Sequence, residues 1–530
     1  MHAEFRPVAG SDRIQALDVL RGVALLGIAL MNVEFFNRPI GDLDAGLPLG
    51  ATGLDYWAGW LVQVFVRGKF WTMFSLLFGM GFAVMLARAT VAGRGFLWPY
   101  LRRTLALAVF GALHFIAVWT GDILFSYATG ALLLVLVFAA KPQVLLWLGV
   151  LLLLLAAAFG IATGAGHALP WQPMLGFGIP LLLLGAVAYA LRRWPVSGWR
   201  AAGLALYLLP ALAMTIGSAA MLGRPPEAEQ DRIQLAEAKT PAARKAVEAA
   251  IAQRDTQRAA HLRDIADETR LMRGDSYAEA TAWRAGHFLK MQGQSIGFAI
   301  ILLGVFLLGA WFIRAGVMTD PAAHLPLFRR LAWIGIPLGI GLSVAGVMVA
   351  PSHLRGQNDA AFQLGMGLGL VGSLAASVGY IGAIVLGLHG RLRQWLAMLA
   401  PAGRMALTNY ISQSVIGTWF FYGYGLGHWG MPRTQQVLYV LAVFALQVLA
   451  SAGGWRASAT GRWNGCGAGR PTDDGRRCGS WPDPRDRRFP RRYPVRVDPA
   501  REPDPGPPRS SDHAIRNPPR RRCGRTRAAA

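Results

Sequence analysis

Long apolar stretches separated by short polar segments make up most of the first 450 residues of the chain. A helix needs about 20 apolar residues to cross the hydrocarbon core of a bilayer. The pattern therefore predicts an all-α fold, a polytopic transmembrane helical bundle of about 12 spans. The predicted spans are residues 17–36, 70–88, 104–120, 122–140, 143–162, 173–191, 201–222, 295–313, 331–350, 362–388, 405–421 and 436–453.

Polar segments divide the chain into five predicted parts. A cytoplasmic N-terminus (residues 1–16) precedes an N-terminal transmembrane bundle (17–222), and a C-terminal transmembrane bundle covers residues 295–453. The insert between the bundles, residues 223–294, is rich in Ala, Glu, Gln and Arg, which are strong helix formers. We expect this insert to be extracytoplasmic and to form solvated helices. The fifth part, residues 454–530 after the C-terminal bundle, is a predicted disordered tail.

Two further features of the apolar pattern affect the topology. The stretch 54–67 is short and amphipathic, which indicates a helix that lies at the membrane interface or re-enters it. The first apolar stretch contains Asp18 and Arg21 and lacks a small-residue cleavage site, so we expect it to remain as the first span. Arginines gather in alternate short loops, and the positive-inside rule then predicts a cytoplasmic N-terminus.

The tail differs in composition from the rest of the chain. It has no Leu or Lys, but 19 Arg, 12 Pro and all three cysteines. Such a segment cannot bury enough apolar surface to fold alone, and an arginine-rich arm that binds anionic lipid or RNA is one interpretation. Out-of-frame translation of a GC-rich gene is the interpretation we prefer. Plausible codons for Trp455–Gly465, reread two bases on, give Ala-Arg-Phe-Arg-Tyr-Gly-Pro-Val-Glu-Trp-Leu.

Composition and charge narrow the class of protein. The chain is 54% hydrophobic and 15% charged, which excludes an ordinary soluble domain. Much of its net charge of +24 lies in the tail and the rest mostly in short loops, so we expect the lipid bilayer and no nucleic acid as a partner. Residues 1–453 contain no cysteine. They therefore offer no disulfide framework and no Cys-based metal site, and we predict no metal.

His114 and Asp122 are the leading candidates for chemistry. His114 lies about ten residues into one apolar helix, and Asp122 lies in the turn before the next. An ionisable group at that depth is expected to face the protein interior. A neutral imidazole can take a proton from a hydroxyl or carry an acyl group, or it can simply pair two helices. Asp122 either orients the imidazole or caps the next helix.

Weaker candidates lie at the ends of other spans. Asp18 and Arg21, three residues apart on one helix face, could bind the phosphates of an acyl donor or form a self-neutralising anchor. Glu34, at the outer end of the first span, is a secondary candidate for a general base. Asn409 and Gln413 share a helix face and either line a pocket or hold helices together.

Five segments resemble the YeiB-like family of bacterial inner-membrane proteins, a domain of unknown function, and the resemblance runs from about residue 11 to about 450. The family usually ends in a phrase like Arg-Phe-x-x-Gly-Pro-x-Glu-Trp, which is missing in frame here. The segments are RIQALDVLRGVALLGIALMNVEFF (13–36), FWTMFSLLFGMGF (70–82), GALHFIAVWTGDILFSYA (111–128), GRMALTNYISQS (403–414) and FYGYGLG (421–427).

The first span is also similar to that of membrane acyltransferases of the heparan-glucosaminide acetyltransferase and acyltransferase-three type. That similarity implies acyl transfer from a cytoplasmic donor such as acyl-CoA, with no bound cofactor, to an extracytoplasmic hydroxyl on an envelope glycan or lipid. His114 and Asp122 would then activate the acceptor. A transporter or permease without covalent chemistry is the alternative, since the same polar groups could carry a solute or proton. The sequence does not give the oligomeric state.

Overall fold

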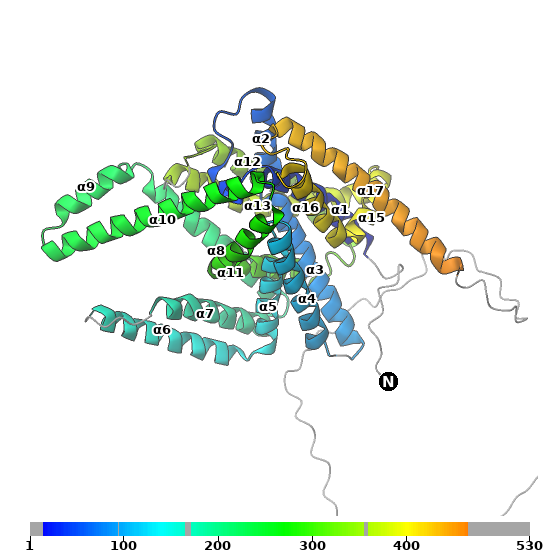
Figure 1. Cartoon of the computed structure of the whole chain (residues 1–530). Helices are drawn as coiled ribbons and strands as arrows, with labels where there is room; N and C mark the ends of the chain where they lie inside the picture. Colours follow the sequence, from blue (N-terminus) through cyan, green and yellow to red (C-terminus); the bar gives the residue numbers. More distant parts are fainter. Residues whose placement is uncertain (1–13, 94, 165–170, 355–358, 465–530) are drawn as a thin grey trace, which may run out of the picture. The chain divides into compact units, whose positions relative to one another are not determined.

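The computed structural model describes residues 14–93, 95–164, 171–354 and 359–464, all of which belong to one compact unit. These residues form helices and the turns between them, which confirms the predicted all-α fold. In this described part there is no strand, and one isolated bridge joins Gly46 to Ser352. Figure 1 shows the arrangement of the helices.

The described residues up to residue 221 form eight α-helices and one 3₁₀ helix. They are α1 (Gln15–Phe36), η2 (Ile40–Ala45), α2 (Gly53–Phe65), α3 (Lys69–Val91), α4 (Leu97–Ala117), α5 (Leu124–Ala139), α6 (Pro142–Gly164), α7 (Gln172–Arg193) and α8 (Ser197–Met221).

The second part begins with the insert and ends with a long helix. Its elements are α9 (Glu227–Glu237), α10 (Pro241–Arg273), α11 (Tyr277–Arg314), η3 (Ala322–His324), α12 (Leu325–Val349), α13 (Ala360–Leu388), α14 (Arg393–Ala397), α15 (Ala400–Arg404), α16 (Ala406–Phe421) and α17 (Arg433–Asn464).

Ten segments of the described chain are long and apolar enough to cross a membrane, which makes this a membrane protein. Helices α5 and α16, with 16 residues each, coincide with the other two predicted spans. Helix α2 covers the stretch expected at the interface, but only Val66–Gly68 separates it from α3. Gly68 has a φ of 82°, a conformation that glycine adopts without strain.

Small residues let the membrane-spanning helices approach closely. A Cβ atom on Gly346 of α12 would collide with the backbone of Gly365 in α13, and one on Gly365 would collide with Gly346. Gly365 opens the GxGxG pattern of residues 365–369, which therefore serves helix packing rather than nucleotide binding. A similar contact joins α3 to α11, where Gly79 faces the carbonyl of Phe306.

The insert is helical, as predicted, and α10 contacts the bundle through its last third. Helices α9 and α10 lie side by side (Figure 1), and Arg254 of α10 joins them through hydrogen bonds of 3.0 and 2.7 Å to Asp231. Helix α10 buries side chains only in its last third, namely Ile265, Glu268, Leu271 and Met272. The rest of α10 is exposed because its residues are polar on every side.

The last helix is held in place by residues from the start of the chain. The carboxylate of Asp55 accepts hydrogen bonds from the backbone N and the hydroxyl of Thr434, at 2.9 and 2.7 Å. Asn37 accepts from the backbone N of Gly430 and Met431. Helix α17 then continues to Asn464, past the predicted boundary at residue 453. Residues 1–13 and 465–530, which include most of the predicted N-terminal and C-terminal segments, lie outside the described residues.

Candidate functional site

His114 and Asp122 form a buried pair at the hinge between α4 and α5. His114 Nδ1 lies 2.8 Å from Asp122 Oδ1, and the two side chains are 3% and 0% exposed. Gly111 allows the close approach of the two helices, because a Cβ there would collide with the backbone of Phe125. Asp122 therefore lies within hydrogen-bonding distance of the imidazole, as the first of its two sequence interpretations requires.

Asp122 performs both of the roles that the sequence left open. Its Oδ1 contacts His114, while its Oδ2 accepts a 2.8 Å hydrogen bond from the backbone N of Phe125 in the first turn of α5. A carboxylate at a helix N-terminus is favoured by the unpaired backbone N–H groups there. Asp122 is therefore fixed by the helix and in turn fixes the imidazole.

The hydrogen bond to Asp122 also assigns a role to each imidazole nitrogen. A carboxylate accepts hydrogen bonds, so Nδ1 carries a proton, and in the neutral imidazole Nε2 is left as the acceptor. The Nε2 atom is buried and has no hydrogen-bond partner among the described residues. The ring of Tyr410 from α16 lies 5.5 Å away, measured between ring centroids, and its hydroxyl accepts a 3.4 Å hydrogen bond from the backbone N of Ile123.

Two charged residues that the sequence analysis did not single out support this hinge. Arg284 of α11 is fully buried, and its guanidinium donates hydrogen bonds to the carbonyls of Ile116 and Ala117, at 2.8 and 3.3 Å. Those carbonyls end α4, so a cation there satisfies the unpaired C=O groups of the helix. Glu268 of α10 accepts a 3.1 Å hydrogen bond from the hydroxyl of Thr120, two residues before Asp122.

Glu268 is a buried carboxyl outside the membrane-spanning helices. Its second oxygen accepts a 3.1 Å hydrogen bond from the backbone N of Ile40 in η2. Burial raises the pKa of Glu268, as does the nearby Asp42 carboxyl to a smaller extent, and the hydrogen bonds that the carboxylate accepts lower it, so that the pKa is about 7. Nothing in the sequence distinguishes Glu268 from the other acidic residues of the insert, because its partners lie far away in the chain.

Glu34 does not pair with His114. Its carboxylate forms ion pairs with Arg38 at 2.6 Å and with Arg433 of α17 at 3.3 Å. Arg433 is buried, and it also donates hydrogen bonds to Gln436 and to the carbonyl of Leu30. The predicted role of Glu34 as a second general base therefore has no support in these contacts, which join α1 to α17.

Asp18 and Arg21 form an ion pair of 3.0 Å near the start of α1. They lie at the other end of this helix from Phe35, whose carbonyl accepts a hydrogen bond from Trp119 in the hinge. The side chain of Arg21 is 29% exposed. No three His, Cys, Asp or Glu side chains gather around a possible metal ion in the described ranges.

Asn409 and Gln413 join α16 to α17. The amide of Asn409 donates to Ser451 at 3.1 Å and to the carbonyl of Ala402, while Gln413 donates to Gln447 at 2.9 Å. These contacts correspond to the helix-joining alternative. Gln413 also borders a small cavity of about 10 Å³, about the room that one water molecule needs.

Comparisons with known proteins find a family and relatives whose activity is uncharacterised. Residues 312–457 match a family described as a protein of unknown function, DUF418. The chain is 28% identical over 462 residues to "uncharacterized protein YxaH" of Bacillus subtilis, covering 85% of this chain and 92% of YxaH. It is 26% identical over 454 residues to YeiB of Escherichia coli, covering 83% and 91% of the two chains. No solved structure matches the chain significantly.

Proposed function

We propose that this protein is an O-acyltransferase of the bacterial inner membrane that acylates an extracytoplasmic hydroxyl. The chain is similar to YxaH and YeiB over most of its length. One observation carries this proposal. A buried imidazole is held by a carboxylate through Nδ1, while its Nε2 has no hydrogen-bond partner among the described residues. In this arrangement Nε2 can act as a general base and accept the proton of a hydroxyl group.

In the proposed reaction, Nε2 of His114 takes the proton of the acceptor hydroxyl as the hydroxyl oxygen attacks the thioester carbonyl carbon of the donor. The C–S bond then breaks, and the leaving thiolate takes the proton back from the imidazolium. The products are an ester and a free thiol, so neither protons nor electrons are left over. Asp122 stabilises the imidazolium between the two proton transfers.

The donor, an acyl-CoA or a similar thioester, is proposed to bind at the cytoplasmic end near Asp18 and Arg21. A guanidinium can form two parallel hydrogen bonds to a phosphate, and Asp18 keeps the Arg21 side chain in place through the 3.0 Å ion pair. The acceptor reaches the hinge from the opposite side, where Trp119 and Thr120 lie. This arrangement needs the N-terminus in the cytoplasm, which the arginine-rich loops support.

The test is mass spectrometry of envelope lipids and glycans from a deletion strain that carries wild-type protein, His114→Asn or the control His324→Asn. The side chain of His324 is partly exposed, and its Nδ1 lies 2.9 Å from the carbonyl of Asp320 in the same loop, so its replacement removes a histidine away from the hinge. We expect an O-acyl ester that depends on His114 and not on His324. Unchanged esters in the deletion strain would contradict the proposal, and solute flux in proteoliposomes without a thioester would favour a permease.

Orientation can be tested independently of the reaction. With the cysteines of the tail replaced, Lys239→Cys puts a single thiol in the exposed turn between α9 and α10. We expect a membrane-impermeant maleimide to label this thiol in intact spheroplasts. Labelling only after lysis would place the insert in the cytoplasm and reverse the proposed topology.

A further inference from the structure

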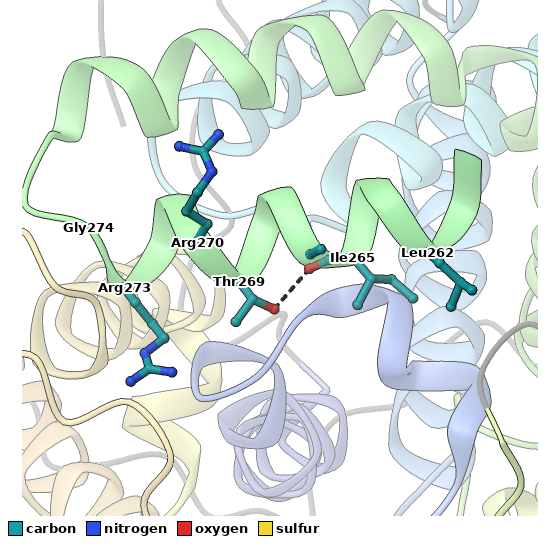
Figure 2. Close-up of a pocket in the computed structure, with 7 residues that line it drawn as sticks. Leu262, Ile265, Thr269, Arg270, Arg273 and Gly274 are labelled. Carbon is teal, nitrogen blue, oxygen red and sulfur yellow. Dashed lines mark hydrogen bonds between the residues drawn. The ribbon is translucent and has the colours of Figure 1, made fainter. Parts of the chain in front are cut away.

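Lys69, the first residue of α3, differs from the other lysines of this protein because it is buried. Its exposed fraction is 1%, whereas the other four lysines of the chain are exposed. Figure 2 shows two cations in the more common surroundings. Arg270 and Arg273 extend to opposite sides of α10 beside a surface hollow of about 620 Å³, and both are exposed to solvent. The ammonium of Lys69 has no comparable contact with solvent.

The ammonium of Lys69 also lacks a partner inside the protein. Its side chain forms no hydrogen bond or ion pair with the described residues. Arg284, which is fully buried as well, donates hydrogen bonds to the carbonyls at the end of α4. Neither α3 nor α13, which packs against the start of α3, contains an Asp or a Glu. A charge buried without a partner strongly destabilises a fold, so this position calls for an anion from outside the chain.

Hydroxyl groups rather than carboxylates surround the start of α3. A Cβ atom on Gly68 would collide with the hydroxyl of Ser373, so α13 lies directly against this turn. Ser377 donates a 2.6 Å hydrogen bond to the carbonyl of Lys69, and Thr72 donates one of 2.7 Å to the carbonyl of Gly68. These hydroxyls are neutral, so they make the surroundings of the ammonium polar without balancing its charge.

The N-terminus of α3 adds a second group that favours an anion. The backbone N–H groups of Phe70 and Trp71 have no hydrogen-bond acceptor in the described part of the chain. Unpaired N–H groups at the start of a helix attract negative charge. Side chains of a helix lean toward its N-terminus, so the ammonium of Lys69 is directed toward the same end.

This end of α3 lies beside the hinge between α4 and α5. The hydroxyl of Tyr127, in the first turn of α5, donates a 3.1 Å hydrogen bond to the carbonyl of Trp71. Phe70 packs in the same hydrophobic cluster as Leu124, two residues after Asp122. The buried ammonium therefore belongs to the part of the bundle that carries the hinge.

We propose that Lys69 and the N-terminus of α3 bind the phosphate or carboxylate group of a small molecule. Such an oxyanion has several oxygens, while an ammonium has three N–H donors. It can therefore neutralise Lys69 and at the same time accept hydrogen bonds from the first N–H groups of the helix. The inference does not rest on acyl transfer, since it concerns the binding of an anion alone.

The test is thermal unfolding of the full chain in detergent, in sodium phosphate or sodium acetate against sodium chloride of equal ionic strength. A ligand that binds only the folded state raises the unfolding temperature. We expect phosphate, acetate or both to stabilise the wild type more than chloride does, and the salt that acts identifies the group.

Two variants assign the effect to Lys69. Lys69→Met keeps the length of the side chain without its charge, and it should bind the anion about tenfold more weakly or worse. In chloride this variant should unfold at a higher temperature than the wild type, because it no longer buries an unpaired charge. The matched control is Lys141→Met, which replaces an exposed lysine before α6 and should respond to the salts as the wild type does.

Three results would overturn the proposal. One is a wild type that unfolds at the same temperature in all three salts. Another is an equal response of the wild type and Lys69→Met to phosphate and acetate, which would assign the effect to salt exclusion from the whole protein surface. The last is a Lys69→Met chain that does not fold, or that unfolds below the wild type in chloride, because the ammonium would then have a stabilising partner within the fold.

Discussion

The carboxylate of Glu268 accepts a 3.1 Å hydrogen bond from the hydroxyl of Thr120, and this bond joins the insert to the hinge that carries Asp122. The other oxygen of Glu268 holds η2 through the backbone of Ile40. One buried carboxyl thus connects three segments that are far apart in the sequence.

Glu268 should make this attachment depend on pH. Its pKa in the folded protein is about 7, above the ordinary value of 4.5, because burial disfavours the charged form. The attachment is then strongest below pH 4.5, weakens as the pH rises through 7, and loses on the order of 3 kcal/mol in total. Hydrogen exchange of the amides 262–274, corrected for intrinsic rates, should be slower at pH 5.5 than at pH 8. In Glu268→Gln this pH dependence should disappear, and a persistent dependence would assign it to another group.

Asp122→Asn should separate catalysis from helix capping. An asparagine oxygen can still accept the hydrogen bond from Phe125, so the protein should keep nearly its full melting temperature. The imidazolium of His114 would lose its charged partner, and acyl transfer should fall by roughly 10²–10⁴-fold. Asp122→Ala also removes the cap, at a further cost of about 1 kcal/mol of stability. Full activity in Asp122→Asn would restrict Asp122 to the structural role.

Glu34→Gln should destabilise the contact between α1 and α17 rather than impair the reaction directly. The substitution leaves Arg38 and buried Arg433 without their shared counter-charge. Breaking a buried ion pair from one side costs about 3–5 kcal/mol. Thermal unfolding in detergent should show this loss, and the double variant Glu34→Gln/Arg433→Gln should recover part of it. A double variant less stable than Glu34→Gln alone would argue against the pairing.

Arg284→Met should loosen the end of α4 that precedes the hinge. The variant keeps much of the apolar length of the side chain but leaves the carbonyls of Ile116 and Ala117 without the guanidinium. Two hydrogen bonds to a charged donor are worth about 3 kcal/mol or more. Hydrogen exchange should rise in residues 114–120 more than in α6, which serves as an internal reference. Equal exchange in both segments would contradict a local role.

Local patterns in the sequence predicted the spans and the central pair of residues. Apolar runs of membrane length require helices, because a backbone in lipid has to satisfy its own hydrogen bonds. His114 and Asp122 are eight positions apart on the two sides of one turn, so the sequence allowed Asp122 to orient the imidazole and equally allowed it to cap the next helix. The end of α17 was harder to place, because a helix can continue beyond the apolar segment with its backbone hydrogen bonds intact.

Contacts between distant segments could not be predicted in the same way. Thr120 and Glu268 are 148 residues apart, and α10 carries many charged residues of which only Glu268 is buried. The position of Glu34 at the outer end of the first span made it a secondary candidate for a general base, whereas its carboxylate pairs with Arg38 and with Arg433 of the last helix. Such partners depend on the packing of the helices, which a single sequence does not reveal.

The capping of α17 by Asp55 has a consequence for biogenesis. Thr434 lies 379 positions after Asp55, whose carboxylate accepts its hydrogen bond. During translation Asp55 is therefore synthesised long before Thr434, and its carboxylate lacks this hydrogen bond until the last helix has been made. Closure of the bundle is therefore a late event that follows delivery of the final helix. A nascent chain interrupted before that helix would present these groups to the quality-control proteases of the membrane.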